Sequence, residues 1–345
     1  MRRRRVLFAS IEKKFSDSTL HPVGVVAALQ VQVASNHGIY YRQHRSRYPA
    51  MQKQLIQSVV ADWGIVTDCR PISGGCISEA ARVTVRDPDG KLHDLFVKSN
   101  RADFQANFRC EFDALNRLAA IEAIRTPKPL KIQTIGDRVL MVMQWIQTGT
   151  TSDFERLGRQ LADLHRKSAG GRIGLEYDNF LGASPQFNTP AATWVQFVQE
   201  NRIGPQLRRA TDRGLIDTPT KRDIETLIEA MPTILAGRDD VTSLLHGDLW
   251  SGNYLFDTCN QPVIIDPAIY YGCREAEFGM LLLFGGCPPS FYESYNDQWP
   301  LPPRWRQRSK VYVLYHLLNH LNLFGATYLS QCGQVAQQML IDMEN

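Results

Sequence analysis

The segment LLHGDLWSGNYLF, residues 244–256, contains a histidine, an aspartate and an asparagine within eight residues. It sets a polar loop between two apolar runs that are typical of strands. A second short apolar run, PVII, follows the turn-like DTCNQ, and Asp266 comes directly after it. Two strands of similar length joined by a short turn are expected to pair antiparallel. That pairing brings Asn253, which precedes the first strand, next to Asp266 at the open end of the hairpin.

This loop and hairpin bring together two carboxylates and one carboxamide, those of Asp248, Asp266 and Asn253. Oxygen ligands of this kind suit Mg²⁺, which usually rests on one or two carboxylates and on substrate phosphates. The spacing H-x-D-x-x-x-x-N, followed by an aspartate after a hairpin, is typical of kinases. We therefore expect Asn253 and Asp266 to hold the metal and Asp248 to act as the catalytic base. For any one of these residues alone, a polar turn would be the better interpretation.

The region before residue 147 contains the other parts of a kinase. Lys98 ends the strand-like run LFVK, and Glu111, on a predicted helix, is expected to pair with it. Gly74 and Gly75 lie between two predicted strands, where glycines let backbone N–H groups approach phosphates. Three residues end the last predicted strand, where a hinge would bind adenine: Gln144, Trp145 and Ile146. These positions predict an ATP site, with a plain turn and an ordinary strand end as the alternatives for the glycines and the hinge.

The hydrophobic pattern divides the chain into two lobes. Short strand-like runs separated by turn signals such as DPDG fill residues 69–146, and apolar residues recur at helical spacing from residue 151 onward. This layout predicts an α+β fold, bilobal and protein-kinase-like, with a small β-rich N-lobe at 51–147 and a large helical C-lobe at 148–345. We expect residues 1–50 to be a basic extension, disordered or preceding a true start at Met51. An Arg-rich targeting peptide is the alternative.

Charge and cysteine content exclude several classes of protein. Residues 1–50 hold nine Lys/Arg against two Asp/Glu, a balance of +7 in a chain whose net charge is +4. The remainder is therefore slightly acidic, unlike a nucleic-acid-binding domain. The longest apolar runs are far shorter than a membrane span. Seven scattered cysteines without a CxxC pair indicate reduced thiols in a cytoplasmic protein rather than a zinc site or a disulfide framework.

The motifs of the chain resemble those of the fructosamine (ketosamine) kinases. The resemblance rests on LLHGDLWSGNYLF, VIIDPAIYYGCREAEFGM and LFGG, and continues in PISGGCISEA, LFVKSN, LGRQLADLHR, YDNFLG and LLNHLNLFG. It covers the chain from about Met51 to the C-terminus. These kinases are relatives of aminoglycoside and choline kinases with a protein-kinase-like fold. Asp266 is followed by Pro267 and Ala268 where protein kinases have Phe-Gly, which fits the small-molecule branch.

The resemblance implies ATP-dependent phosphorylation of a ketoamine on the third-carbon hydroxyl of its sugar. Such adducts form when sugars glycate amines, and the phosphorylated adduct decomposes, so the activity is a deglycation repair. Carried over, Asp248 is the base, Asn253 and Asp266 are the metal ligands, Lys98 positions the phosphates and Glu111 orients Lys98. The expected partners are ATP, Mg²⁺ and ketoamines, free or protein-bound. We expect no nucleic acid, no membrane, and a monomer or weak dimer.

Three further residues and a cluster have weaker support. Trp250, two residues past the base, either walls the acceptor site or packs the loop. His246 is expected to anchor the loop as scaffold. Cys76 follows the glycines, where a thiol beside phosphates and Lys98 could become reactive. Similar loop cysteines in the family suggest redox sensitivity, and a small buried residue is the alternative. The aromatic residues between 291 and 305 are expected to form core, and the alternative is that they shape an acceptor cleft.

Two rival functions stay open at this level. One is a kinase for another small acceptor, such as an amino sugar or an amino alcohol. The other is an inactive kinase fold that binds nucleotide or a partner. The presence of Lys98, Glu111, Asp248, Asn253 and Asp266 together argues against an inactive fold.

Overall fold

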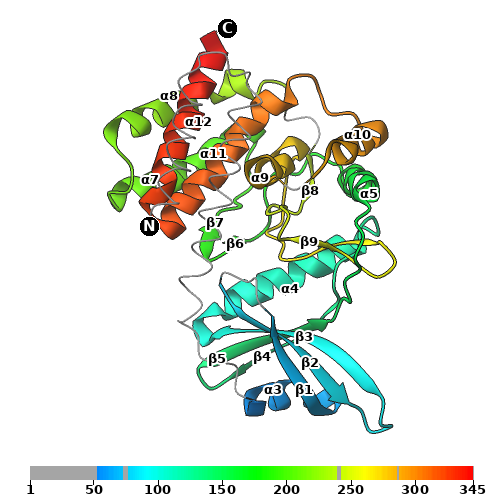
Figure 1. Ribbon diagram of the computed structural model, residues 1–345. Helices are drawn as coiled ribbons and strands as arrows, with labels where there is room; N and C mark the ends of the chain where they lie inside the picture. The colour runs from blue at the N-terminus through cyan, green and yellow to red at the C-terminus, as the bar shows by residue number, and fades with distance from the viewer. Residues whose placement is uncertain (1–52, 73–76, 239–241, 286, 345) are drawn as a thin grey trace, which may run out of the picture.

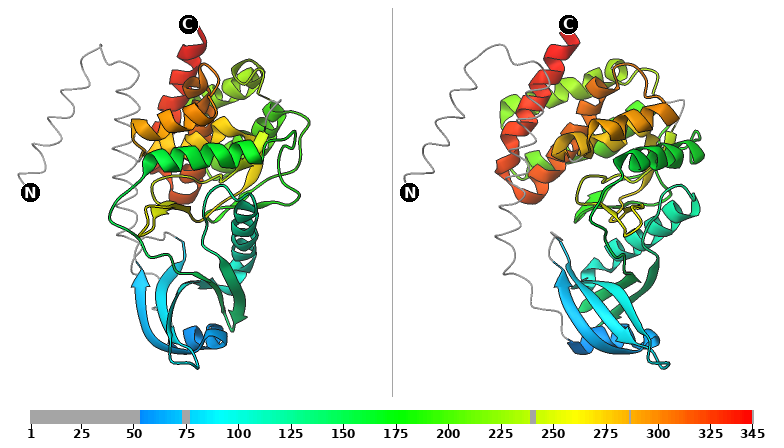
Figure 2. Two further views of the ribbon diagram at one scale, coloured as in Figure 1. Left: turned by 90° about the vertical axis from the view of Figure 1, so that its right-hand side faces the viewer. Right: turned by 45° about the vertical axis from the view of Figure 1, so that its right-hand side comes forward.

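The computed structural model describes residues 53–72, 77–238, 242–285 and 287–344. Within these ranges a small lobe built on a β-sheet is joined to a larger, mostly helical lobe (Figures 1 and 2). The sheet lies at one end of the molecule and the C-terminal helices lie at the other (Figure 1). The predicted α+β, bilobal arrangement is confirmed.

The N-lobe is a five-stranded antiparallel sheet. Its strands are β1 (Ile65–Ile72), β2 (Glu79–Arg86), β3 (Leu92–Arg101), β4 (Pro129–Ile135) and β5 (Arg138–Gln144), in the order β1-β2-β3-β5-β4. The hairpin predicted before residue 146 is the β4–β5 pair, and DPDG joins β2 to β3. Lys98 lies inside β3, because this strand continues to Arg101. The prediction that Lys98 ends its strand is therefore wrong.

Alternation along β5 divides the N-lobe core into two layers. Leu140 and Val142 belong to a cluster with Val59 of α3 (Lys53–Val59), whereas Val139 and Met141 pack with Phe108 of α4 (Gln105–Ala120). Successive side chains of a strand point to opposite faces, so each face of the sheet receives its own helix. Helix α4 lies between the sheet and the C-lobe (Figure 1). Asn107 and Glu111 of this helix border the cleft between the lobes.

Helices form most of the C-lobe. They are α5 (Phe154–Lys167), α6 (Trp194–Val198), α7 (Gly204–Asp212), α8 (Thr218–Ile234), α9 (Phe278–Phe284), α10 (Pro289–Gln298), α11 (Trp305–Phe324) and α12 (Leu329–Glu344). Short helical turns are η1 (Ala61–Trp63), η2 (Ala102–Phe104), the π-helix η3 (Gln199–Ile203), η4 (Arg274–Glu277) and η5 (Ala326–Tyr328). Among the described residues, no helix has the length and apolar character that crossing a membrane requires.

Three pairs of short antiparallel strands carry the polar segments of the C-lobe. They are β6 (Asn179–Leu181) with β7 (Ser184–Gln186), β8 (Thr242–Leu245) with β11 (Tyr270–Cys273), and β9 (Tyr254–Phe256) with β10 (Pro262–Ile264). The last pair is the hairpin predicted from the sequence, with Tyr254 opposite Ile264. β5 ends at Gln144 and α5 begins at Phe154, so the predicted lobe boundary after residue 147 falls in the segment that joins them.

Candidate active site

A cleft of about 520 Å³ lies between the two lobes. It is bordered by all the predicted site residues that the structure describes: Lys98, Glu111, Gln144, Trp145, Ile146, Asp248, Trp250, Asn253 and Asp266. Residues that are far apart in the sequence thus meet in one cavity. Gly74, Gly75 and Cys76 lie outside the described residues, so the phosphate loop and the redox-sensitive thiol stay predictions.

One lysine links the two lobes at this cleft. Lys98 Nζ lies 2.6 Å from Glu111 Oε1 on α4 and 2.6 Å from Asp266 Oδ1 after β10. Burial alone would lower the pKa of Lys98, but the two carboxylates outweigh burial and hold this pKa above its usual value. Burial raises the pKa of Glu111, although the Lys98 ammonium opposes that rise. The lysine therefore carries a positive charge where an anionic ligand of the cleft would meet it.

Asp248 and Asn253 are joined within the polar loop. Asn253 Nδ2 donates to the backbone oxygen of Asp248 at 2.7 Å and to its Oδ2 at 3.2 Å. Because the amide nitrogen is used in this way, the amide oxygen of Asn253 is the atom left to face a cation. Burial and the Asp266 carboxylate raise the pKa of Asp248 well above its usual value, and the Asn253 hydrogen bond lowers it in part. A raised pKa makes a carboxylate a better proton acceptor.

Asp266 adopts a backbone conformation that most residues avoid. Its φ is 57°, in the left-handed region, although it precedes Pro267 and residues before proline favour extended backbone. Such strain persists only where the surroundings hold it, and it clusters at functional sites. Ile265 N donates to Asn253 O at 2.9 Å and fixes the start of this turn at the end of the β9–β10 hairpin. The Asp266 side chain is left 43 % exposed.

The oxygen donors at this corner fit a small, hard cation. Asp266 offers a carboxylate and Asn253 an amide oxygen, and both border the same cleft as Asp248. Within the part of the chain that the structure describes, no three His, Cys, Asp or Glu side chains are grouped to hold a metal ion. A cation here would need further oxygens from a ligand, and nucleotide phosphates supply these for Mg²⁺ in other proteins. The donor set thus fits a metal that is bound together with a nucleotide better than a metal bound by the protein alone.

A buried carboxylate that the sequence analysis missed supports the polar loop. Glu277 accepts hydrogen bonds from the backbone N–H groups of His246, at 2.6 Å, and Gly247, at 3.0 Å. His165 Nε2 lies 3.3 Å from the same carboxylate. Burial would raise the pKa of Glu277, but its contacts with His165 and His246 outweigh burial and lower it. The acid within the motif REAEFGM was a visible signal, but no spacing rule connected it to the loop.

His246 holds two segments of the site together, as expected of a scaffold residue. Its Nε2 lies 2.8 Å from Ile265 O, and its backbone oxygen accepts from Ala268 N at 2.8 Å. Burial lowers the pKa of His246, so the ring is neutral at neutral pH. The next residue, Gly247, has a φ of 80°, and a Cβ atom there would lie 2.2 Å from Ala268 O. The glycine of HGD is therefore required by both backbone conformation and space.

Aromatic side chains close two edges of the cleft. Trp250 borders the cleft and also packs on Phe284 of α9, with ring centroids 5.2 Å apart, and its contact with an acceptor stays a prediction. At the hinge, Trp145 stacks on Phe96 with centroids 6.4 Å apart. The Arg82 guanidinium lies 5.1 Å from the Trp145 ring centroid on the N-lobe side. These contacts hold Trp145 against the N-lobe sheet, and its role at an adenine-binding hinge stays a prediction.

The aromatic cluster between residues 291 and 305 is core, as expected. Tyr295 and Trp305 pack on Phe278 with ring centroids 5.0 and 5.1 Å away. Phe291 and Tyr295 are fully buried. The Tyr295 hydroxyl also lies 2.8 Å from His165 Nδ1, which connects this core to the His165–Glu277 contact behind the polar loop.

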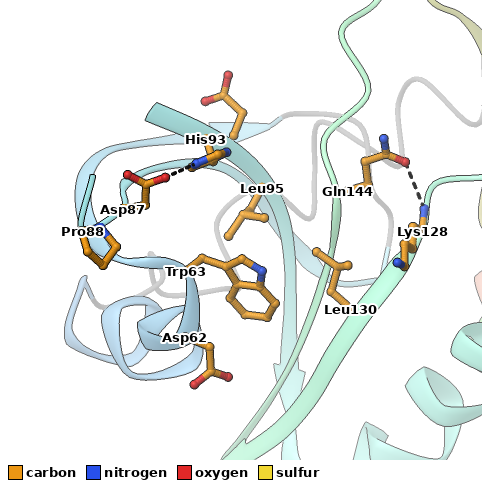
Figure 3. Close-up of a pocket in the computed structure, with 10 residues that line it drawn as sticks. Asp62, Trp63, Asp87, Pro88, His93, Leu95, Lys128, Leu130 and Gln144 are labelled. Carbon is orange, nitrogen blue, oxygen red and sulfur yellow. Dashed lines mark hydrogen bonds and ion pairs between the residues drawn. The ribbon is translucent and has the colours of Figure 1, made fainter. Parts of the chain in front are cut away.

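A second hollow, of about 470 Å³, opens on the N-lobe beside the hinge (Figure 3). Its acids already have basic partners: Asp87 with His93 at 2.6 Å, Asp94 with Arg82 at 2.6 Å, and Asp62 with Lys131 at 2.7 Å. Trp63 and Leu95 give it an apolar floor (Figure 3). The cleft between the lobes instead brings Lys98, Asp248 and Asp266 together, so we assign the chemistry to that cleft.

Comparisons with known proteins point to a single family. The family model described as fructosamine kinase matches residues 48–342. A ketoamine kinase candidate from Synechocystis is 36 % identical over 278 residues, which cover 80 % of this chain and 91 % of the relative. The chloroplastic protein-ribulosamine 3-kinase of Arabidopsis thaliana is 37 % identical over 281 residues, which cover 80 % of this chain and 83 % of the relative.

Solved structures of related proteins also resemble this chain. A fructosamine-3-kinase candidate from Thermobifida fusca has a TM-score of 0.72 and 31 % identity, and the match covers 85 % of this chain and 100 % of that one. An aminoglycoside phosphotransferase with 16 % identity has a TM-score of 0.57 over 83 % of this chain, which shows a shared fold. The chain belongs to the fructosamine kinase family.

Proposed function

We propose that this protein is an ATP-dependent ketoamine 3-kinase that phosphorylates the third-carbon hydroxyl of the sugar of a glycated amine or protein. The observation that carries the proposal is the meeting of Asp248, Asn253 and Asp266 with the Lys98–Glu111 pair in one cleft. Family membership and relatives named for ketoamine and protein-ribulosamine phosphorylation support it. Because the phosphorylated adduct decomposes, the activity is a deglycation repair.

ATP binds on the N-lobe side of the cleft in this proposal. Adenine lies at the hinge, where the strand ends and backbone groups of residues 144–146 become available for hydrogen bonds. The phosphates lie toward Lys98, whose ammonium neutralises part of their charge. Glu111 keeps that ammonium in place through the 2.6 Å contact. Gly74 and Gly75 are the proposed phosphate loop.

Asp248 is the proposed catalytic base. Its carboxylate accepts the proton of the attacking sugar hydroxyl, and the hydrogen bond from Asn253 Nδ2 orients it. Asn253 and Asp266 hold Mg²⁺, which when bound supplies charge neutralisation at the phosphate oxygens. The transition state of phosphoryl transfer is loose, so positioning and electrostatic stabilisation supply most of the acceleration. The residues of the cleft are suited to those two tasks.

An ATP-consumption screen tests the proposal. The acceptors are ketoamines derived from ribulose, erythrulose and fructose, free and on a glycated protein, with choline and an aminoglycoside as controls. We expect ketoamine-dependent consumption that is absent in Asp248→Ala, while that variant still binds ATP. Consumption with only choline or the aminoglycoside would favour the rival small-molecule kinases. Nucleotide binding without turnover on any acceptor would favour an inactive kinase fold.

A cytoplasmic location and a monomer or weak dimer belong to the same proposal. The scattered cysteines support a reducing compartment, and six of them are free within the described residues. The plant relatives are named as chloroplastic, so fractionation of the source cell is the direct test of location. Light scattering at several protein concentrations tests the oligomeric state.

A further inference from the structure

Two buried carboxamide side chains, those of Asn179 and Gln186, donate hydrogen bonds to the backbone of the segment that follows Asp266. Asn179 Nδ2 donates to Ile269 O at 2.8 Å, and Gln186 Nε2 donates to Ala268 O at 3.0 Å. Asn179 and Gln186 face each other across the β6–β7 pair, at the open end of this small hairpin. Their exposed fractions are 3 % and 1 %. Both donors therefore act in a setting where an unmade hydrogen bond is costly.

The two carboxamides also fix each other. Gln186 Nε2 and Asn188 Nδ2 both donate to Asn179 Oδ1 at 2.8 Å. Tyr315 OH donates to Gln186 Oε1 at 3.1 Å. Gln186 thus uses its amide nitrogen twice and its amide oxygen once, which leaves its orientation no freedom. A buried polar network that is satisfied in this way is rigid.

An arginine anchors the network to the C-lobe. Arg202 is 3 % exposed, and its Nη2 donates to Asn188 Oδ1 at 2.9 Å. Its guanidinium lies 4.1 Å from the ring centroid of Tyr270 and 4.4 Å from that of Phe197. Arg202 belongs to the π-helix η3, and π-helical turns are frequent at functional sites. The hairpin is therefore held by a group that is itself enclosed in the core.

The hydrogen bonds from Asn179 and Gln186 hold the backbone of Ala268 and Ile269, which sets the position of Asp266. His246 O accepts from Ala268 N at 2.8 Å, and Gln186 donates to the oxygen of the same residue, so Ala268 is held from two sides. Pro267 has no N–H and a fixed φ, so little freedom separates Ala268 from Asp266. The left-handed φ of Asp266 is of the kind that persists only when its surroundings determine it.

The same hairpin reaches the other lobe. Phe180, Leu181 and Gly182 border the cleft, and Asn107 Nδ2 of α4 donates to Gly182 O at 3.3 Å. Helix α4 carries Glu111, which contacts Lys98. The β6–β7 hairpin thus connects the backbone behind Asp266 to the helix that holds the other partner of Lys98.

We propose that Asn179 and Gln186 are positioning residues for the metal-binding carboxylate of Asp266. They set its place by holding the backbone two and three residues after it, without touching the reacting atoms. The inference rests on the proposed function, in which Asp266 binds Mg²⁺ together with the nucleotide.

The main test is Gln186→Met, which keeps the length of the side chain and removes its donors. The readout is the affinity for Mn²⁺ in the presence of ADP, measured from the electron paramagnetic resonance signal of free Mn²⁺. We expect the dissociation constant to rise about fivefold, the effect of losing the hydrogen bond to Ala268 O, which is the bond of Gln186 that reaches the backbone behind Asp266. The Mg²⁺ concentration for half-maximal turnover rises by a similar factor, and KM for the ketoamine changes by less than about twofold.

A milder variant and a matched control accompany it. Tyr315→Phe removes only the hydroxyl that holds Gln186 Oε1, and we expect a rise of about twofold. It carries the test if Gln186→Met does not fold. Asn322→Ala is the control, since this carboxamide is also buried and donates to Gln206 O and Oε1, at 2.9 and 2.8 Å. It lowers the melting temperature and leaves Mn²⁺ affinity unchanged.

Asp266→Ala separates failure of this inference from failure of the proposed function. Loss of Mn²⁺ binding in Asp266→Ala, with wild-type affinity in Gln186→Met and Tyr315→Phe, overturns the positioning role alone. Wild-type affinity in Asp266→Ala overturns the metal assignment on which the inference rests. An equal loss of Mn²⁺ affinity in Asn322→Ala also overturns the inference. The loss of affinity would then come from a less stable protein and not from the missing hydrogen bond to Ala268 O.

Discussion

Lys98 and Asp266 stand 168 residues apart in the sequence, yet Lys98 Nζ and Asp266 Oδ1 lie 2.6 Å apart across the cleft. The same ammonium contacts Glu111 at 2.6 Å. The side chains differ in exposure, with 11 % for Lys98, 15 % for Glu111 and 43 % for Asp266. We infer that Glu111 is the permanent partner of the lysine, and that Asp266 is the partner a bound nucleotide and its metal can replace.

Glu111→Gln is expected to weaken the use of ATP while leaving the fold intact. The amide keeps the size of the side chain but loses the charge that holds Lys98 toward α4. Hydrogen bonds to charged groups contribute about 1.5–3 kcal/mol, so kcat/KM for ATP should fall about ten- to hundredfold. Steady-state kinetics with varied ATP measure this fall.

The control for Glu111→Gln is an ion pair on the N-lobe surface. Asp62 and Lys131 are 2.7 Å apart, but the Asp62 side chain is 65 % exposed, and exposed pairs contribute little. Asp62→Asn should therefore keep wild-type kinetics. An equal effect in the two variants would show that Glu111 acts through general charge rather than through Lys98.

Asp248→Asn is expected to separate chemistry from binding. The new amide keeps the shape of the Asp248 side chain. Its oxygen can still accept the hydrogen bond from Asn253 Nδ2, which lies 3.2 Å from Asp248 Oδ2 in the native protein. It cannot accept a proton from the sugar hydroxyl, so kcat should fall about 10²–10⁴-fold. Calorimetric titration with Mg²⁺ and ADP should give a wild-type affinity. A kcat close to that of the wild type would exclude Asp248 as the base.

The parts of the site that follow from local spacing could be predicted from the sequence. Asn253 and Asp266 flank two short strands, and antiparallel pairing leaves them no other place than the same end of the hairpin. Lys98 and Glu111 lie on a strand and on the α-helix that follows it after one short 3-10 turn. The end of β3 does not follow from the sequence, because the polar run Ser99, Asn100 and Arg101 is typical of a loop. Their backbone nevertheless pairs with β5.

The parts that depend on tertiary contacts could not be predicted. Glu277 supports His246 from 31 residues away, and no periodicity connects two such positions. Asn179 and Gln186 stand on strands of three residues, which are too short for an alternating pattern. The groups that they hold after Asp266 are the backbone carbonyls of Ile269 and Ala268, and a backbone carbonyl gives no signal in a sequence. Residues that support a site in this way can be recognised only from the folded structure.

Buried neutral histidines should make the protein less stable in mild acid. Burial lowers the pKa of His165, His246 and His316. The unfolded chain therefore binds protons near pH 6.5 that the folded chain does not, so each histidine lowers the free energy of unfolding as pH falls below that value. Asp248 and Glu111 have raised pKa values and act in the opposite direction. A variant that removes a single histidine isolates one contribution.

His316→Met isolates this effect away from the catalytic loop. We expect the change in the free energy of unfolding between pH 7.5 and pH 5.5 to differ from that of the wild type by about 1.4 kcal/mol, the value of one proton over one pH unit. Urea unfolding at the two pH values measures the change. The prediction fails if the two proteins show the same dependence on pH.

Gly247→Ala should damage the catalytic loop through backbone geometry alone. The glycine has a φ of 80°, and the new Cβ would lie 2.2 Å from Ala268 O. The loop must move, which disturbs the 3.0 Å hydrogen bond from Gly247 N to Glu277 Oε1 and displaces the adjacent Asp248. We expect a loss of stability of about 1–3 kcal/mol together with a fall in kcat of about tenfold or more.

Gly214→Ala is the matched control for Gly247→Ala. Gly214 also has a positive φ, of 62°, but a Cβ there would have nothing within 4 Å. The substitution therefore introduces backbone strain of about 1–2 kcal/mol without a clash. Thermal unfolding should show a loss in both variants, whereas kcat should fall only in Gly247→Ala. If kcat stays at the wild-type level in Gly247→Ala, the contact between Gly247 and Ala268 does not set the position of the base.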